Sequence, residues 1–269
     1  MAKLEKWSVS KLKCYQDCPY KFYCNHVLKM YQVDNQKALT WGCTFHETAE
    51  YLYSDFSYPN KERFLDFYKK HWISNQYVKG WNKLKAINPH ATSWNFLGYQ
   101  SFNEEQEYYQ LGERIVSEFW NKHTKTKILP FATELKFEEK LPTGDILTGS
   151  IDKVDLIKRL FYIIDYKTGK WESSPEKLKE DLQLGLYQWA FCKKYNIPYS
   201  SVEYTALYYV RSFNLVPVTF YYKDIEKMLN VTTAIIMKVD SDLFPKKPRE
   251  NFLCKNCQYK NNPCDSPRA

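Results

Sequence analysis

A chain of 269 residues can bury a substantial core, as one large domain or as two small ones. Its 39 basic and 31 acidic residues leave a formal net charge of +8, and 23 tyrosines and 8 tryptophans make the composition unusually aromatic. Such a surface suits a polyanion with bases that can stack, although many moderately basic proteins never bind nucleic acid. No apolar run approaches the roughly 18 residues of a membrane span, and the first residues lack the apolar segment of a signal peptide, so we expect a cytoplasmic, intracellular protein without a membrane partner.

Residues 8–31 are expected to form two helices. Serines that can cap a helix come first, and apolar residues follow at helical spacing. Pro19 would break a helix interior and fits better in a first turn. We therefore expect a short helix, a break at Asp17-Cys18-Pro19 and a second helix, which leaves the Cys18 sulfur at a loop.

Residues 40–53 also predict a helix, because apolar side chains recur on one stripe and His46 lies on the neighbouring face. The next segment, about 55–128, is rich in Tyr, Trp, Phe, Lys and Glu and is interpreted as a helical insertion. A loop is expected at about 87–97, and a long amphipathic helix at 103–122. None of this segment carries recognisable chemistry.

Residues 148–170 are the most informative stretch, and residues 131–141 lead into it as a strand. Two apolar, β-branched segments, 151–157 and 161–166, flank the charged corner Lys158-Arg159. This pattern predicts a β-hairpin.

Three polar side chains of the hairpin can share one patch. Strand side chains alternate between faces, so Asp165 and Lys167 point the same way, Tyr166 points the other way into a core, and Asp152 can face them from the partner strand. Two carboxylates and an ammonium group suit a hydrolase of phosphodiesters that uses Mg²⁺ or Mn²⁺. An edge-strand ion pair between Asp165 and Lys167 is the alternative. Asp155 lies an odd number of positions after Asp152, faces away and is interpreted as a solvated or structural carboxylate.

Residues 175–195 predict one helix, with Pro175 in its first turn and with Gln183 and Tyr187 four residues apart on one face. The chain then continues as two strands, a helix and a Pro-, Lys- and Cys-rich tail without regular secondary structure, at residues 202–210, 215–222, 224–239 and 244–269.

The eight cysteines of an intracellular protein indicate metal or iron–sulfur ligation for some of them rather than disulfides. Cys254, Cys257 and Cys264 supply three thiolates from one loop, so a fourth ligand must come from elsewhere. Such a site could hold a [4Fe–4S] cluster or a tetrahedral zinc ion, and the spacing does not choose between them. Cys43 and Cys192 fit as buried thiols without a metal.

Taken together, these motifs resemble the PD-(D/E)XK nuclease superfamily, in the branch of RecB-like exonucleases that includes the iron–sulfur AddB-type and CRISPR-adaptation nucleases. The helical segment between His46 and Phe131 is longer than compact members of the family need, so substrate handling there is not carried over. The matching motifs, in the order of the family, are SKLKCYQDCPYKFY, GCTFHETAE with His46, GSIDKVD with Asp152, IIDYKTGK with Asp165 and Lys167, QLGLY with Gln183 and Tyr187, and the tail cysteines.

The resemblance implies a role for each motif. The metal would be held by His46, Asp152, Asp165 and the backbone carbonyl of Tyr166. Lys167 would orient the attacking water or deprotonate it, and the second role would require a lowered pKa. The remaining pair, Gln183 and Tyr187, would steady Lys167 or the DNA strand. Glu134 could be an extra ligand, but an ordinary strand charge is the simpler interpretation.

For the cysteines, the resemblance implies that Cys18, followed by proline, is the fourth ligand beside Cys254, Cys257 and Cys264. It favours a [4Fe–4S] cluster over structural Zn²⁺. Cys14 and Cys24 are reserve candidates. A site of this kind would join the two ends of the chain, so its role would be structural.

The sequence therefore predicts an α/β fold with a central mixed β-sheet flanked by helices, in a single domain over residues 1–269. The helical insertion would span about 55–128 and the Cys-rich tail 244–269. The predicted function is a Mg²⁺- or Mn²⁺-dependent DNA exonuclease, acting on single-stranded or end-containing DNA in recombination, repair, phage replication or CRISPR adaptation. One alternative is a non-catalytic iron–sulfur or zinc protein that binds nucleic acid as part of a larger complex. Another is a nuclease active only together with partner proteins.

Overall fold

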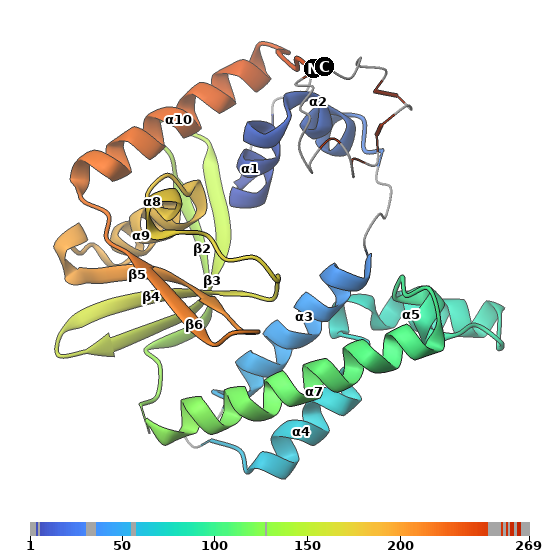
Figure 1. Ribbon diagram of the computed structural model, residues 1–269. Coiled ribbons are helices and arrows are strands. Elements are labelled where there is room, and N and C mark those ends of the chain that lie inside the picture. Colours follow the sequence, from blue (N-terminus) through green and yellow to red (C-terminus); the bar gives the residue numbers. More distant parts are fainter. Residues whose placement is uncertain are drawn as a thin grey trace.

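The computed structural model describes residues 4, 6–30, 36–54, 58–126, 128–246, 254, 257, 259–260 and 263–264. In this part of the chain a six-stranded mixed sheet lies between two layers of helices (Figure 1), which confirms the predicted α/β fold. The strands are β1 (Lys6–Ser8), β2 (Ala132–Lys140), β3 (Ile146–Ile157), β4 (Leu160–Lys167), β5 (Val202–Tyr209) and β6 (Asn214–Val218). The helices are α1 (Val9–Asp17), α2 (Pro19–Phe22), the π-helix η1 (Tyr23–Val27), α3 (Gln36–Tyr51), α4 (Lys61–Lys70), α5 (Asn75–Ile87), α6 (Ser93–Phe96), α7 (Phe102–Lys125), α8 (Pro175–Leu178), α9 (Leu182–Tyr195), the 3₁₀ helix η2 (Tyr199–Ser201) and α10 (Tyr222–Asp240).

Strand β3 pairs with three other strands of the sheet. β2 pairs antiparallel along one side of it, whereas β1 and β4 share the other side. β1 runs parallel to residues 146–148 of β3, and β4 runs antiparallel to residues 153–157. Residues 149–152 separate these two pairings, so the sheet forks there. β5 continues the sheet parallel to β4, and β6 pairs antiparallel with β5.

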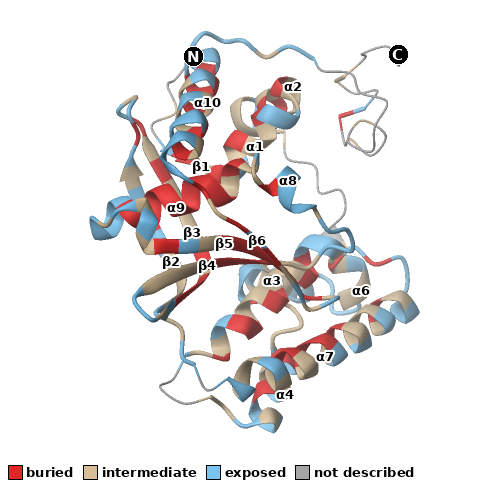
Figure 2. Cartoon of the chain, turned by 60° about the vertical axis from the view of Figure 1, so that its left-hand side comes forward, coloured by how far each residue is buried: buried red, intermediate tan, exposed pale blue. Residues whose placement is uncertain are grey.

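The two faces of the sheet carry separate hydrophobic cores. One core includes Leu12 of α1, Ile163 of β4 and Leu186 of α9. The other includes Phe45 of α3 and Tyr166 of β4. Buried residues follow both helical layers and the strands between them (Figure 2). Neighbouring side chains of β4 enter different cores, so side chains of α3 can reach the fork from one face of the sheet and side chains of α9 from the other.

Close packing of α7 against α3 and α4 sets the position of α3, the helix that carries His46. A Cβ atom added at Gly112 of α7 would lie 2.1 Å from Tyr68 Oη and 2.6 Å from Trp41 Nε1, so only glycine fits this crossing. The helices α4 to α7 lie within the predicted insertion, and of these α4 and α7 pack with α3 in the core on one face of the sheet.

Several element predictions are wrong in detail. Residues 175–195 form two helices instead of one, because Asp181 caps a new helix: its Oδ1 accepts hydrogen bonds from the N–H groups of Gln183 (2.8 Å) and Leu184 (3.2 Å). The expected loop at 87–97 contains the short helix α6, and the three-residue strand β1 was not predicted. Part of the tail 244–269 lies outside the described residues. Among the helices that are described, none is long and apolar enough to span a bilayer.

Candidate active site

The predicted hairpin is present, with strands longer than expected. Lys158 and Arg159 join them with positive φ values of 50° and 72°, as a tight two-residue hairpin turn requires. The antiparallel register ends at the pair Lys153 and Ile164. The next residues along the two strands, Asp152 and Asp165, therefore stand at the fork of the sheet.

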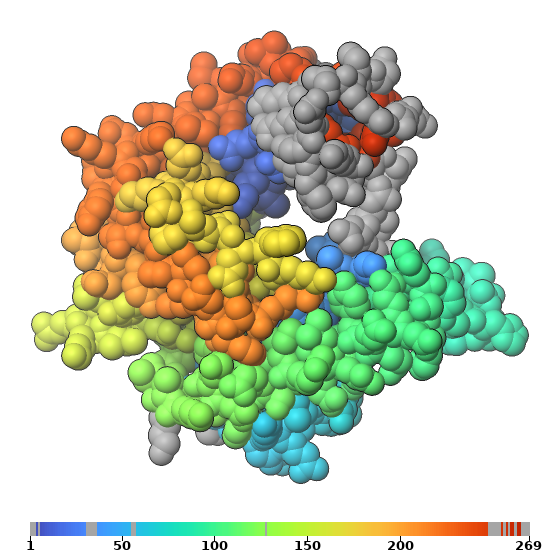
Figure 3. All heavy atoms as spheres, viewed as in Figure 1, coloured from blue at the N-terminus to red at the C-terminus, as the bar shows by residue number. Residues whose placement is uncertain are grey.

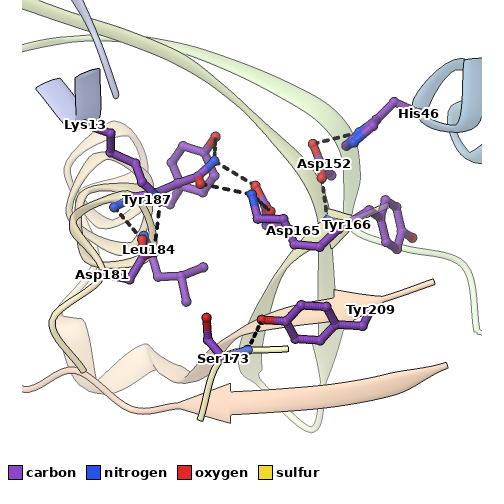
Figure 4. A network of polar contacts seen from close by, with 12 residues as sticks. Lys13, His46, Asp152, Asp165, Tyr166, Ser173, Asp181, Leu184, Tyr187 and Tyr209 are labelled. Atoms are coloured by element: carbon purple, nitrogen blue, oxygen red, sulfur yellow. Dashed lines mark hydrogen bonds and ion pairs between the residues drawn. The ribbon is translucent and has the colours of Figure 1, made fainter. Parts of the chain in front are cut away.

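Asp152 terminates the pairing of the two strands. Its Oδ2 accepts a hydrogen bond from the backbone N–H of Tyr166 at 2.6 Å, in place of a backbone carbonyl. Its Oδ1 lies 3.4 Å from His46 Nδ1. Figure 4 shows Asp152 between these two partners. One carboxylate thus connects α3 to the backbone of β4.

On the other side of the fork, four polar side chains form a continuous network. Lys167 Nζ lies 2.7 Å from Asp165 Oδ2 and donates to Gln183 Oε1 at 3.1 Å. Gln183 Nε2 donates to Asp165 Oδ1 and to Tyr187 Oη, both at 2.9 Å. The two residues on α9 therefore hold the lysine and the carboxylate of β4 in place, as the spacing of four residues allows.

Asp181, which was not predicted as a site residue, supports this network. By capping α9 it fixes the first turn of the helix, where Gln183 lies, and it forms an ion pair with Lys13 of α1 at 3.1 Å. The signal in the sequence is an aspartate directly before an apolar helical run, which is a common helix start.

Glu134 joins the site, although an ordinary strand charge was the simpler interpretation of the sequence. One ligand atom from each of His46, Glu134 and Asp152 lies within 4.8 Å of the others. Glu134 Oε1 is 3.9 Å from His46 Nδ1, and Ser150 Oγ donates to Oε2 at 2.8 Å. Glu134 also has a φ of 44° inside strand β2, a conformation that costs about 1–3 kcal/mol for a residue with a side chain.

The acidic groups shift the pKa values of the site. Burial lowers the pKa of His46, but the carboxylates of Asp152, Asp165 and Glu134 outweigh it and raise the pKa to about 9. Burial raises the pKa of Asp165 above its usual value, against the opposing effect of Lys167. Burial also raises the pKa of Glu134, and Asp152 adds to this effect. The site therefore holds crowded negative charge that a cation would relieve.

The raised pKa of His46 predicts that metal binding strengthens with pH. At pH 7 the imidazole is protonated, and a metal can bind it only after the proton leaves. Between pH 7 and pH 8 the affinity for Mn²⁺ should rise by up to about tenfold, with release of a proton on binding. Calorimetry in buffers of different ionisation enthalpy measures both quantities. In His46→Gln, the proton release and most of the pH dependence should be absent. If both are the same as in the wild type, His46 is not the group that loses the proton when Mn²⁺ binds.

Asp155 lies behind the site and is buried, so the solvated interpretation is wrong and the structural one is confirmed. It forms an ion pair with Lys153 at 2.8 Å, and the side chains are 11% and 8% exposed. The Lys153 ammonium also lies 5.3 Å from the centre of the Tyr53 ring. This ion pair lies on the face of β3 that packs against the helical insertion, where burial lowers the pKa of His123 on α7 and the charge of Lys153 lowers it further.

The cysteines of the two ends of the chain come together. Burial raises the pKa of the Cys24 thiol, and the nearby thiols of Cys264, Cys257 and Cys18 add to it. Tyr259 of the tail is buried, and Tyr20 of α2 donates to the carbonyl of Pro263 at 3.4 Å. All eight cysteines are among the described residues, and none forms a disulfide.

Comparison with known proteins identifies relatives of the chain. A model of the PD-(D/E)XK nuclease superfamily matches residues 6–262. Proteins named as a subunit of an ATP-dependent helicase/deoxyribonuclease, from Staphylococcus aureus strains JH9 and N315, are each 26% identical over 203 residues, which covers 64% of this chain and 16% of theirs. The matched region thus spans about a sixth of these curated relatives. Among solved structures, one described as "Crystal structure of SSO0001" is similar with a TM-score of 0.33 and 19% identity, covering 58% of this chain and 76% of that one.

Proposed function

Because the chain belongs to the PD-(D/E)XK nuclease superfamily, we propose that it is a DNA nuclease dependent on a divalent metal, with its active centre at the fork between β3 and β4. The observation that carries the proposal is the convergence of His46, Glu134 and Asp152 within 4.8 Å, beside the pair formed by Asp165 and Lys167. These groups come from α3, β2, β3 and β4, so only the folded chain assembles them.

The donor set fits a hard divalent cation. Carboxylate oxygens suit Mg²⁺ and Mn²⁺, and an imidazole nitrogen suits Mn²⁺ in particular. His46, Asp152, Asp165 and the backbone carbonyl of Tyr166 would hold the ion, with Glu134 as a further ligand. When bound, the ion would lower the pKa of a coordinated water and offset negative charge on the phosphate.

Lys167 would act as a cation. Burial lowers the pKa of Lys167, but Asp165 outweighs this effect, and the pKa lies above its ordinary value. A protonated ammonium cannot accept a proton, so this geometry supports orientation of the water and stabilisation of phosphate charge rather than general-base catalysis. Gln183 would hold the side chains of Lys167 and Asp165 in position, and the hydrogen bond to Tyr187 would fix the side-chain amide of Gln183.

For the substrate we propose single-stranded or end-containing DNA, degraded from an end. The relatives named as helicase/deoxyribonuclease subunits support DNA as the substrate and support action within a larger complex. Recombination and repair are the processes that this likeness favours, with phage replication and CRISPR adaptation as further possibilities from the family resemblance.

The test uses the purified chain with end-labelled linear DNA, single- and double-stranded, in Mn²⁺ or in EDTA. The proposal expects release of labelled mononucleotides or short fragments in Mn²⁺ and none in EDTA. A closed circular single strand should survive if the enzyme degrades from ends, and its cleavage would instead identify an endonuclease. Salt-sensitive binding without cleavage under all these conditions would identify a non-catalytic nucleic-acid-binding protein.

We further propose that Cys18, Cys254, Cys257 and Cys264 hold a [4Fe–4S] cluster that joins the two ends of the chain, with zinc as the alternative. The gathering of Cys18, Cys257 and Cys264 around Cys24 supports a metal site there. It also makes Cys24 a competing ligand, because this thiol is fully buried among the others.

Matched cysteine variants test this assignment. Anaerobically purified protein should be brown and contain iron, and Cys18→Ser should lose the colour, most of the iron and thermal stability. Cys24→Ser and the control Cys43→Ser, on α3, should keep the iron. Loss of iron in Cys24→Ser with retention in Cys18→Ser would show that Cys24 is the fourth ligand in place of Cys18. A colourless, zinc-containing protein would exclude the cluster.

A further inference from the structure

Trp171 is the most exposed of the large apolar side chains that the structure describes, at 90%. It lies in residues 168–174, the loop that leads from β4 to α8. Single exposed apolar residues are common on protein surfaces and need no explanation by themselves. The position of Trp171 and the support beneath it set this residue apart.

The loop is braced on both sides of Trp171 by the β5–β6 hairpin. Before it, the carbonyl of Thr168 accepts from Arg211 Nε at 2.8 Å. After it, the Ser173 N–H donates to Tyr209 Oη at 2.7 Å. Glu172 accepts from Ser212 Oγ and from Asn214 Nδ2. The indole is therefore held out in solvent by ordered neighbours, so a ligand would not have to order the loop on binding.

The same loop lies against the active-site helix. Thr168 Oγ1 is 3.4 Å from the position that a Cβ of Gly42 would occupy, one turn before His46 on α3. The Arg211 guanidinium stacks 4.9 Å from the centre of the Trp41 ring on the same helix. Figure 3 shows the yellow surface of this region beside the blue start of α3. The loop thus lies against the first half of the helix that carries His46.

Trp171 is also close to the reacting groups along the chain. It lies four positions after Lys167, so their Cα atoms are at most about 15 Å apart. Successive nucleotides of a stacked strand are about 3.4 Å apart, so a strand with its scissile phosphate at Lys167 reaches Trp171 within about five nucleotides. Lys170, which is exposed, directly precedes Trp171 and adds a positive charge to the loop.

We propose that Trp171 is a stacking platform for an unpaired base of the DNA strand that enters the active site. This inference rests on the proposed nuclease function and specifies its substrate: an indole can stack on a base whose face is free, whereas the faces of bases inside a duplex are covered by their neighbours. The platform makes the site select single strands or frayed ends without reading their sequence.

The test measures binding without cleavage, in Lys167→Ala protein with Mn²⁺ and a fluorescent single-stranded oligonucleotide of about 15 thymidines, close to the upper site size of a single-strand-binding groove. Adding Trp171→Ala should weaken binding by about 5- to 150-fold, whereas Trp171→Phe should keep most of the affinity. Tyr222→Ala, which removes an exposed aromatic ring from the first turn of α10, is the control and should leave binding unchanged. Blunt duplex of the same length should bind Trp171→Ala and its parent equally.

An oligonucleotide series with one abasic site moved along the strand identifies the contact. At one position the missing base should weaken binding to the parent but not to Trp171→Ala, because the stacking partner is already absent. Equal affinity of Trp171→Ala and its parent for the intact strand would overturn the proposal, as would an effect that is the same at every abasic position. The nuclease assignment can fail separately. If the wild-type chain never cuts DNA but the abasic pattern is still observed, the stacking role of Trp171 stands and the proposed nuclease activity is contradicted.

Discussion

Lys167→Ala is expected to slow cleavage of end-labelled single-stranded DNA by about 10²- to 10⁴-fold in Mn²⁺, while the chain stays folded. The lysine places a cation 2.7 Å from Asp165, at the fork where the proposed metal ligands converge. Removing it leaves those ligands in place but removes the group that would orient the water and stabilise charge on the phosphate. Binding of Mn²⁺ should therefore persist, and single-turnover cleavage rates should fall.

The matched control is Lys194→Ala, which removes an exposed lysine from the far end of α9. Its rate should stay within about twofold of wild type, since surface substitutions away from a site have small effects. Wild-type rates in Lys167→Ala protein, purified separately from any host nuclease, would contradict the role assigned to Lys167.

Asp152→Asn is expected to remove most metal binding and most activity while leaving the fold intact. The amide oxygen can still accept the hydrogen bond from the Tyr166 N–H, so the ends of the two strands keep their connection. The negative charge is lost, however, and with it the proposed metal ligand that lies between His46 and the backbone of β4. We expect Mn²⁺ affinity to fall at least about tenfold and the cleavage rate by about 10²-fold or more.

Asp155→Asn provides a control with the same chemical change three residues along the same strand. It leaves the buried Lys153 charge without its partner, which should lower the stability of the chain by about 3–5 kcal/mol and leave Mn²⁺ affinity unchanged. The two variants should therefore give opposite results. Asp152→Asn should lower the Mn²⁺ affinity measured by calorimetry, whereas Asp155→Asn should lower the stability measured by urea denaturation. Loss of metal affinity in Asp155→Asn, or full affinity in Asp152→Asn, would contradict the site as described.

The hairpin, its turn and the residues of α9 could be predicted because they depend on local patterns. Alternation along β4 separates Tyr166 from Asp165 and Lys167, and helical spacing brings Gln183 and Tyr187 to one face. The arrangement of these residues around Asp165 then follows from packing one helix on one strand.

The proximity of Glu134 to His46 and Asp152 depends on long-range geometry, which a local sequence pattern does not show. The register of Glu134 with Asp152 is set by pairing across a separate strand, and its left-handed backbone angle leaves no trace in composition. The break before α9 was missed for a different reason. The apolar residues Leu178 and Leu182 keep helical spacing across the charged residues 179–181, and only the capping bonds of Asp181 show where the second helix begins.

The helical insertion was predicted as helices, but its position was not. Helices of this amphipathic kind can pack on any apolar surface, and contacts such as that of Gly112 with Tyr68 and Trp41 are not encoded in periodicity. In the structure these helices hold α3 against the sheet, so they contribute to the placement of His46.

The central claim is that a divalent metal binds at the fork of β3 and β4. Its most direct test is a crystal structure of the chain with Mn²⁺, with anomalous scattering measured at the manganese edge. We expect one strong peak within bonding distance of Asp152 and His46, next to Asp165 and Glu134, and no such peak in Asp152→Asn. A fully occupied Mn²⁺ elsewhere, with this cluster empty at millimolar metal, would contradict the claim.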